Sequence, residues 1–160
     1  KICAHAEEIY TSHAWPKKPL FYLCAPSVTD ATVAPPGKEN LFVLIPISTK
    51  LSGDDETVRE QYLQIVLNRL KAVKGIDLNK HIVYKRSYGI SDFKSDYHAF
   101  QGNAYGLANT LSQTALLKPT MKSKKLNNLY FAGQLTLPGP GMPPSIISGR
   151  LAAHSIIKNL

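Results

Sequence analysis

Residues 127–145 constrain the fold more than any other stretch of this sequence. They combine a short apolar run, a turn rich in Gly and Pro, and the start of a helix. Leu129–Ala132 is apolar and lies between Asn and Gly, which is typical of a buried strand. The turn that follows contains three glycines, which permit positive φ angles or the close approach of a ligand. These are Gly133, Gly139 and Gly141.

A helix is expected directly after this turn, over residues 144–160. Pro143 and Pro144 suit its first turn, where a missing N–H costs nothing. A helix N-terminus presents unpaired N–H groups and partial positive charge, so it favours an anionic or electron-rich group. One stripe of small and apolar residues on this helix is expected to pack closely. It consists of Ile146, Gly149, Ala153 and Ile157.

The first half of the chain contains signals for two strands. Residues 1–19 are mixed and end in a Pro-containing loop. Leu20–Ala25 and Leu41–Ile47 are apolar and separated by a turn-rich segment. Because sequential strands usually pair, we expect these two to be antiparallel neighbours.

A helix and a third strand are predicted next. Asp54–Glu56 places acidic residues at a helix start, and Gly75 suits a C-cap. Spacings of three and four predict one buried stripe between them, formed by Val58, Tyr62, Ile65, Val66, Arg69 and Leu70. Alternation over His81–Tyr88 predicts a strand, whereas residues 91–127 form no clear pattern.

The composition is that of a folded protein with its own core. The chain has 160 residues, of which 44% are hydrophobic and 19% charged. Its longest apolar run, Leu41–Ile47, is far shorter than the roughly 20 residues of a membrane-spanning helix. We see no secretory signal pattern. Cys3 and Cys24 have no metal-ligand spacing and are interpreted as reduced thiols, which favours the cytoplasm.

Self-contained catalytic motifs are absent. The sequence has no nucleophile elbow, Walker A loop, zinc-protease helix, Cys-x-x-Cys or Gly-x-Gly-x-x-Gly. Five scattered histidines predict no metal site. Asp92 and Asp96 are four residues apart and are compatible with acid/base work, but capping or a solvated turn is the favoured interpretation. No catalytic residue is assigned.

The net charge of +8 suggests an anionic partner or simply a solvated basic face. The densest cluster comprises Lys118, Lys122, Lys124 and Lys125. No aromatic residues are interleaved with it, which argues against nucleic acid as a partner. From the residues alone, the chain is a small α+β unit with a Gly/Pro turn that leads into a helix.

The stretch from Asn127 resembles the closing flavin motif of the carotenoid (phytoene) desaturases, within the FAD-dependent amine-oxidase-like flavoproteins. The matching pieces are Asn127–Gly133, then Thr136-x-Pro138-Gly139-x-Gly141-x-Pro143, then Ser148-Gly149-Arg150. Upstream segments resemble the same family in the same order. They are Pro26–Asp30, Ala34–Gly37, Phe42–Pro46 and Phe100–Leu107.

The resemblance implies that the chain is the C-terminal portion of a larger flavoenzyme. The fold would be α+β. Residues 1–100 would form part of a substrate-binding domain, with a short antiparallel or mixed sheet and a covering helix. Residues 101–160 would connect to the terminal strand and helix of a Rossmann-like FAD domain. The N-terminal Rossmann portion, which holds the ADP half of FAD, would lie outside this chain.

The resemblance also implies a site and an activity. The family dehydrogenates carotenoid polyenes by hydride transfer to FAD, at the membrane surface. Residues that match the flavin segment are Gly133, Gln134, Gly139, Gly141, Met142, Pro143 and Pro144. Tyr97, Phe100 and Tyr105 are candidates to line the substrate channel, although core packing is the favoured interpretation of each. The isolated chain is expected to lack tight FAD binding and activity.

Two alternatives stay open. Gln134, Leu137 and Pro144 differ from the residues that are frequent in the family, which leaves room for a related flavoenzyme. Such a relative would be a polyene isomerase, a retinol saturase or an amine oxidase. The other alternative is a noncatalytic module that binds an anionic surface through residues 118–125.

Overall fold

The computed structural model describes residues 2–107, 113 and 117–158. Two compact units divide the chain, Lys1–Gly102 (unit 1) and Asn103–Leu160 (unit 2). Across the described residues the elements make a small α+β arrangement with four α-helices and one two-stranded antiparallel sheet. The predicted coarse class is therefore confirmed.

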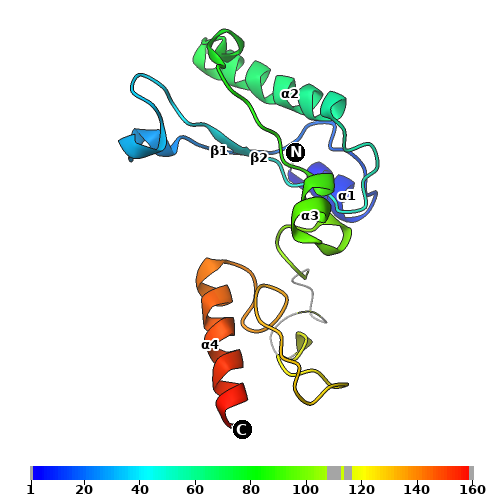
Figure 1. The fold of residues 1–160 in the computed structure, drawn as a ribbon. Helices are drawn as coiled ribbons and strands as arrows, with labels where there is room; N and C mark the ends of the chain where they lie inside the picture. The colour runs from blue at the N-terminus through cyan, green and yellow to red at the C-terminus, as the bar shows by residue number, and fades with distance from the viewer. Residues whose placement is uncertain (1, 108–112, 114–116, 159–160) are drawn as a thin grey trace. The chain divides into compact units, whose positions relative to one another are not determined.

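In unit 1, a β-ribbon forms where the sequence predicts it. Strands β1 (Tyr22–Cys24) and β2 (Phe42–Leu44) pair antiparallel, with Leu23 opposite Val43. Between them the chain makes two 3₁₀ turns, Pro26–Val28 and Ala31–Val33. In Figure 1 the segment with these two turns extends beyond the paired strands β1 and β2.

Helix α2 (Glu56–Lys74) has the predicted caps. The Asp55 side chain accepts the N–H of Val58, and Gly75 ends the helix with φ of 73°. The predicted stripe faces inward, because none of its residues is exposed and Val66 is fully buried. Leu67 joins Val66 in the core.

Polar contacts attach α2 and helix α1 (Ile2–Tyr10) to the loop that precedes β1. Tyr62 donates to the carbonyl of Pro16 at 2.7 Å, and its ring lies 5.1 Å from that of Trp15. His5 on α1 is buried. Its Nδ1 accepts the Leu20 N–H at 2.7 Å, so Nε2 carries the proton and donates to the Pro46 carbonyl at 3.0 Å.

In unit 1 one helix was not predicted, and one predicted strand is wrong. The mixed residues at the start form α1, which the sequence analysis did not predict. His81–Tyr88 is not a strand: a 3₁₀ turn, Leu78–His81, precedes an irregular segment, and helix α3 (Ile90–Tyr97) follows. The side chains of Val83 and Tyr84 are 74% and 78% exposed. The alternation of apolar and polar residues over His81–Tyr88 therefore does not produce a strand, because no partner strand lies beside it among the described residues.

In unit 2, helix α4 (Met142–Lys158) is preceded by a long loop. The helix begins two residues before its predicted start, and its predicted last residues, 159–160, lie outside the described residues. The predicted strand Leu129–Ala132 is reduced to a single antiparallel bridge between Lys122 and Tyr130. Hydrogen bonds from Ser123 N–H to the Leu129 carbonyl and from Phe131 N–H to the Met121 carbonyl flank the bridge.

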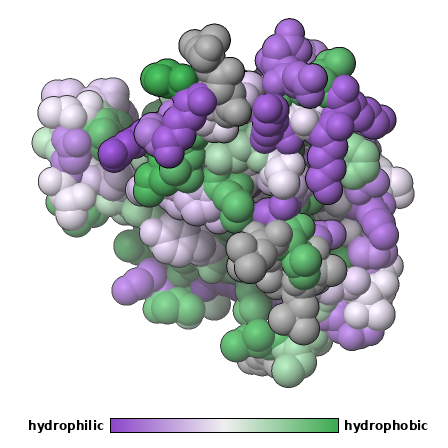
Figure 2. Space-filling view, turned by 90° about the horizontal axis from the view of Figure 1, so that it is seen from below, coloured by the Kyte–Doolittle hydropathy of each residue, from purple (hydrophilic) through white to green (hydrophobic). Residues whose placement is uncertain are grey.

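The packing face of α4 also differs from the prediction. Ser148 and Ala152 are its buried residues. In the predicted stripe, Ile146 and Ile157 are 75% and 69% exposed. On the face of the molecule seen in Figure 2, apolar side chains reach the surface at several places among the hydrophilic ones.

Candidate functional site

The Gly/Pro loop of residues 133–141 is fixed to α4 by one buried serine. Ser148 Oγ accepts the Gly133 N–H at 2.8 Å and lies 2.8 Å from Thr136 Oγ1. Thr136 Oγ1 donates to the Gly133 carbonyl at 3.0 Å, so the Ser148 hydroxyl is left to donate to Thr136 Oγ1. The Ser148 and Thr136 side chains are buried, and all their protons have acceptors. The start of the loop is therefore held in one geometry.

A buried lysine supports the other end of the loop. Lys118 Nζ donates to the Pro138 carbonyl at 3.3 Å, and the residue is only 8% exposed. Gly139 has a φ of 136°, and a Cβ at this position would overlap the Lys118 ammonium group. Gly139 is thus required both by its backbone conformation and by the lysine beneath it.

Gly133 faces open space instead. Its φ is 105°, and no protein atom of the described chain lies within 4 Å of the place where a Cβ would be. The backbone here is accessible to a flat ligand at van der Waals distance. Gly133 is therefore available for close contact with a ligand.

The first turn of α4 offers one N–H to a ligand. Pro143 and Pro144 have none, and the Ser145 N–H bonds to the Gly141 carbonyl at 3.0 Å. Within the described part of the chain, Met142 keeps an N–H that has no hydrogen-bond partner, as is usual in the first turn of a helix. Its side chain is 83% exposed. An open glycine backbone, a helix-terminal N–H and apolar Met and Pro side chains fit a flat, electron-rich ring such as a flavin.

The seven predicted cofactor residues thus lie in one continuous segment, from the loop to the first turn of α4. The three predicted substrate-lining aromatics are exposed. Tyr97 and Phe100 belong to unit 1 and are 69% and 75% exposed, and Tyr105 belongs to unit 2 and is 65% exposed. Within this chain the three side chains do not pack in the core, and their contact with a substrate stays a prediction.

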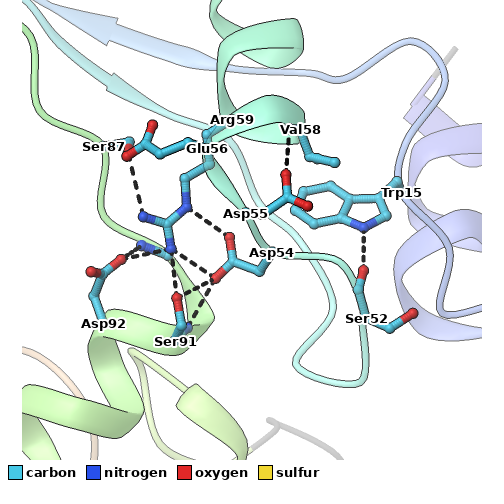
Figure 3. Close-up of polar contacts among 11 residues, drawn as sticks. Trp15, Ser52, Asp54, Asp55, Glu56, Val58, Arg59, Ser87, Ser91 and Asp92 are labelled. Carbon is cyan, nitrogen blue, oxygen red and sulfur yellow. Dashed lines mark hydrogen bonds and ion pairs between the residues drawn. The ribbon is translucent and has the colours of Figure 1, made fainter.

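A second polar cluster lies in unit 1, around Arg59 (Figure 3). The guanidinium donates to both carboxylate oxygens of Asp54, at 2.8 and 2.9 Å. It also lies 2.7 Å from Asp92 and donates to the hydroxyls of Ser87 and Ser91. The side chains of Arg59 and Asp54 are 14% and 8% exposed. The cluster joins the start of α2 to the start of α3.

The electrostatics of this cluster are those of a structural ion pair. The hydrogen bonds from Arg59 hold the pKa of Asp54 down to about 2, against the cost of burial. A Cβ on Gly89 would lie 2.7 Å from both Asp54 oxygens. Both carboxylate oxygens of Asp54 and three nitrogens of Arg59 are engaged within the cluster, which is typical of a structural ion pair.

Asp92 and Asp96 have the structural roles that were favoured. Asp92 accepts the Gly89 N–H at 2.7 Å, which caps α3, and pairs with Arg59. Asp96 accepts the Tyr88 hydroxyl at 2.7 Å. The sequence analysis missed two features, the Arg59 cluster and the burial of Lys118. An arginine four residues after Asp55, at the acidic start of the helix, is a weak signal for the first.

In the described ranges, no three His, Cys, Asp or Glu side chains are grouped so as to hold a metal ion. Within the same residues, no helix is both long and apolar enough to cross a bilayer. Cys3 is exposed and Cys24 is half-buried, and both are free thiols.

Known proteins show what the chain is similar to. No protein-family model matches it. Carotenoid 3,4-desaturase from Haloarcula japonica is 45% identical over 156 residues, which are 98% of this chain and 31% of that protein. A 4,4'-diapophytoene desaturase (4,4'-diaponeurosporene-forming) from Staphylococcus aureus strain Newman is 33% identical over 148 residues, 89% of this chain and 30% of that protein.

The chain therefore spans about a third of the length of the curated relatives that it matches. Over nearly all of its own length it is a carotenoid desaturase-like segment. The predicted resemblance is confirmed.

Proposed function

We propose that this chain is the C-terminal part of an FAD-dependent carotenoid desaturase, which dehydrogenates phytoene-like polyenes in carotenoid biosynthesis. The main support is the loop of residues 133–141, which Ser148 holds in one geometry against the start of α4. These residues are the ones that resemble the family's flavin segment. The similarity to two desaturases over most of the chain agrees with it.

In this proposal FAD lies against the loop and supplies an acceptor for the hydrogen removed from the polyene. The protein binds and orients the ring. Gly133 lets it approach the backbone, and Gly139 and Gly141 shape the turn beside it. The Met142 N–H stabilises negative charge on the ring edge. Gln134, Pro143 and Pro144 complete the contact surface.

The remaining two thirds of the enzyme would cover surfaces that are exposed here. Large apolar side chains lie exposed in both units, including Val83, Tyr84, Ile146 and Ile157. Exposed apolar area of this kind marks interaction surfaces. We propose that the N-terminal Rossmann portion covers part of it, and that Tyr97, Phe100 and Tyr105 contact the polyene. A lipid substrate would place the enzyme in the cytoplasm, peripheral to a membrane.

The sharpest test is Gly133→Ala in the protein encoded by the whole reading frame. Gly37→Ala is the matched control, because Gly37 also has positive φ (71°) and open space around a new Cβ. Ala at positive φ costs about 1–2 kcal/mol, and more at Gly133, where φ of 105° lies outside the left-handed region, so circular dichroism must first show that both variants fold. We expect bound flavin, measured by visible absorbance after gel filtration, to fall at least tenfold in Gly133→Ala alone.

Equal flavin content in the two variants would refute the placement of the flavin at Gly133. A reading frame without a Gly-x-Gly-x-x-Gly loop upstream of Lys1 would refute the larger proposal. Incubation of the purified enzyme with phytoene separates a desaturase from an isomerase, a saturase or an amine oxidase by its products. The 160-residue chain by itself is expected to contain no stoichiometric flavin and to be inactive.

A further inference from the structure

The positive charge of the protein is concentrated in unit 2. The chain has 19 Lys and Arg against 11 Asp and Glu, and no Asp or Glu occurs after Asp96. Unit 2 contains six of the cations, so unit 1 has 13 against 11 and unit 2 has six against none. The six are Lys118, Lys122, Lys124, Lys125, Arg150 and Lys158.

Four of these six cations line one hollow in the surface, with a volume of about 560 Å³. We call it the lysine hollow. Its lysines are Lys118, Lys122, Lys124 and Lys125, and Ser123 and Phe131 are also in its wall. Its volume is in the range of small-molecule sites, about 300–1,000 Å³.

A hollow in unit 1 shows how this differs from ordinary surface charge. It has a volume of about 350 Å³ and is lined by Glu60 and Lys85, which form an ion pair with each other. Its positive charge is therefore neutralised from within. The lysine hollow has no carboxylate in its wall, and the sequence of unit 2 supplies no acidic side chain to reach it. Like charges gathered in a concave surface attract an anion from solution.

The loop that bears these lysines is held in shape by its own hydrogen bonds. Ser123 Oγ accepts the N–H groups of Lys125 and Leu126, each at 3.1 Å. The bridge between Lys122 and Tyr130 closes the base of the loop, and the Lys122 ammonium lies 5.8 Å from the Tyr130 ring centroid. The hydroxyl proton of Ser123 remains to be donated. A fixed loop of cations loses little entropy when it binds an anion.

Lys118 forms the buried wall of the hollow. Its Nζ bonds to the Pro138 carbonyl, so this ammonium group is already fixed in place. Lys124 and Lys125 are exposed and free to close over a ligand. The hollow thus has a fixed interior cation and adjustable outer ones.

We propose that the lysine hollow binds a phosphate group. Several ammonium groups and a hydroxyl that face one hollow suit a multiply charged oxyanion. The phosphate belongs either to a free ion or to a lipid headgroup, and both share the chemistry that the hollow recognises. The proposal does not require a bound flavin: Lys118 also supports the loop at Pro138, but the three lysines changed in the test, Lys122, Lys124 and Lys125, do not contact that loop in the described structure.

The test compares two triple variants of the full chain that lose the same charge. The first is Lys122→Ala, Lys124→Ala and Lys125→Ala together, which empties the outer hollow. The control is Lys17→Ala, Lys18→Ala and Lys38→Ala, three exposed lysines of unit 1. The probes are inorganic phosphate, phosphatidylcholine vesicles with phosphatidic acid, and vesicles of phosphatidylcholine alone. Calorimetry measures the first probe, and co-sedimentation measures the vesicles.

We expect the unmodified chain to bind phosphate, phosphatidic acid vesicles or both, and not the neutral vesicles. The hollow variant should bind about 100-fold more weakly and the control within about threefold, because each lysine near an anionic surface contributes about a factor of five to ten. Binding of inorganic phosphate identifies a free ion as the source, and binding of vesicles alone identifies a headgroup.

Binding to neither anionic probe would overturn the proposal. An equal loss in the two variants would also overturn it, because net charge would then explain the binding. Circular dichroism confirms that both variants keep their helices. The hollow variant is also made in the protein encoded by the whole reading frame, and its flavin content is measured. An unchanged flavin content there shows that the phosphate and flavin proposals can fail separately.

Discussion

Units 1 and 2 stabilise their loops by opposite means. In unit 1, cations pair with carboxylates: Arg59 with Asp54 and Asp92, Lys71 with Asp77, and Lys85 with Glu60. In unit 2 there is no acidic side chain, and buried hydroxyls and carbonyls hold the loop. No carboxylate of unit 2 neutralises its outer lysines, which are left for partners outside the chain, whereas Arg59, Lys71 and Lys85 of unit 1 are paired within its fold.

The contrast has a consequence for function. A loop held by hydroxyls, carbonyls and one lysine, without an ion pair, keeps its geometry when an anion or a charged ring binds beside it. Ion pairs at the same place would compete with the ligand for the same cations. Unit 2 is thus suited to binding anionic groups, and unit 1 is suited to rigid packing.

The largest expected effect is that of Arg59→Met. Removal of the guanidinium leaves Asp54 buried without its partner, which typically costs about 3–5 kcal/mol of unfolding free energy. Urea denaturation followed by Trp15 fluorescence measures it, because Trp15 is the single tryptophan and packs against α2.

Lys85→Met is the matched control, since Lys85 and Glu60 are 58% and 42% exposed. An exposed pair contributes about 0–1 kcal/mol. Equal losses in the two variants would show that the Arg59 cluster has no special role in unit 1.

The next largest expected effect is that acidic pH lowers the stability of unit 1 more than that of unit 2. The pKa of Asp54 is about 2 in the fold and 3.8 as its ordinary value. A lowered pKa gives stability that is present above pH 4 and is lost as the pH falls toward 2. We expect unit 1 to lose up to about 2 kcal/mol from this group over that interval. Asp54→Asn should flatten the decline.

Unit 2 has no acidic side chain to protonate over the same interval. Amide-exchange protection factors around Gly133 should therefore change less than those in α2. Parallel loss of protection in both units would contradict independent acid responses and show that they unfold together.

The sequence predicts the elements of unit 1 that depend on neighbouring residues. Helix α2 is found with its Asp cap, its Gly75 end and its buried stripe, because these signals lie within the helix itself. The β1–β2 pair is found because its two apolar runs are close in sequence. Both predictions rest on residues that are close in sequence, so they do not depend on how distant parts of the chain pack.

Predictions that need a distant partner fail. Alternation over His81–Tyr88 suggests a strand, but a strand forms only with a neighbour, and the described chain provides none. Residues Leu129–Ala132 form a single bridge for the same reason. On α4, spacing alone did not reveal that Ser148, a polar residue, faces inward to hold the loop.

The sequence predicts which segment forms the candidate site better than it predicts which side chains hold that segment in place. Glycines, prolines and the helix start indicate where the backbone is open, and their order carries the resemblance. Neither composition nor spacing shows that Lys118 is buried beneath Gly139, because that contact joins residues about 20 apart across an irregular loop. In the structure, the four lysines of the predicted cluster therefore differ: Lys118 is buried and the other three are exposed.

The smallest expected effect tests the hydroxyl-based design of unit 2. Ser148→Ala removes the acceptor of the Gly133 N–H and the donor to Thr136 Oγ1. Loss of a buried partner costs about 1–2 kcal/mol, so exchange of the Gly133 amide should become about tenfold faster. Ser145→Ala, on the same helix, is the control, because the Ser145 bond to Gly141 uses its backbone N–H.

Thr136→Val completes a double-mutant cycle with Ser148→Ala. Since the two hydroxyls share one closed set of hydrogen bonds, the second change should cost less than the first. Strict additivity, or equal exchange in Ser145→Ala and Ser148→Ala, would show that the loop is held by something other than these hydroxyls. The contrast between a unit held by ion pairs and a unit held by hydrogen bonds without ion pairs would then no longer apply to the site.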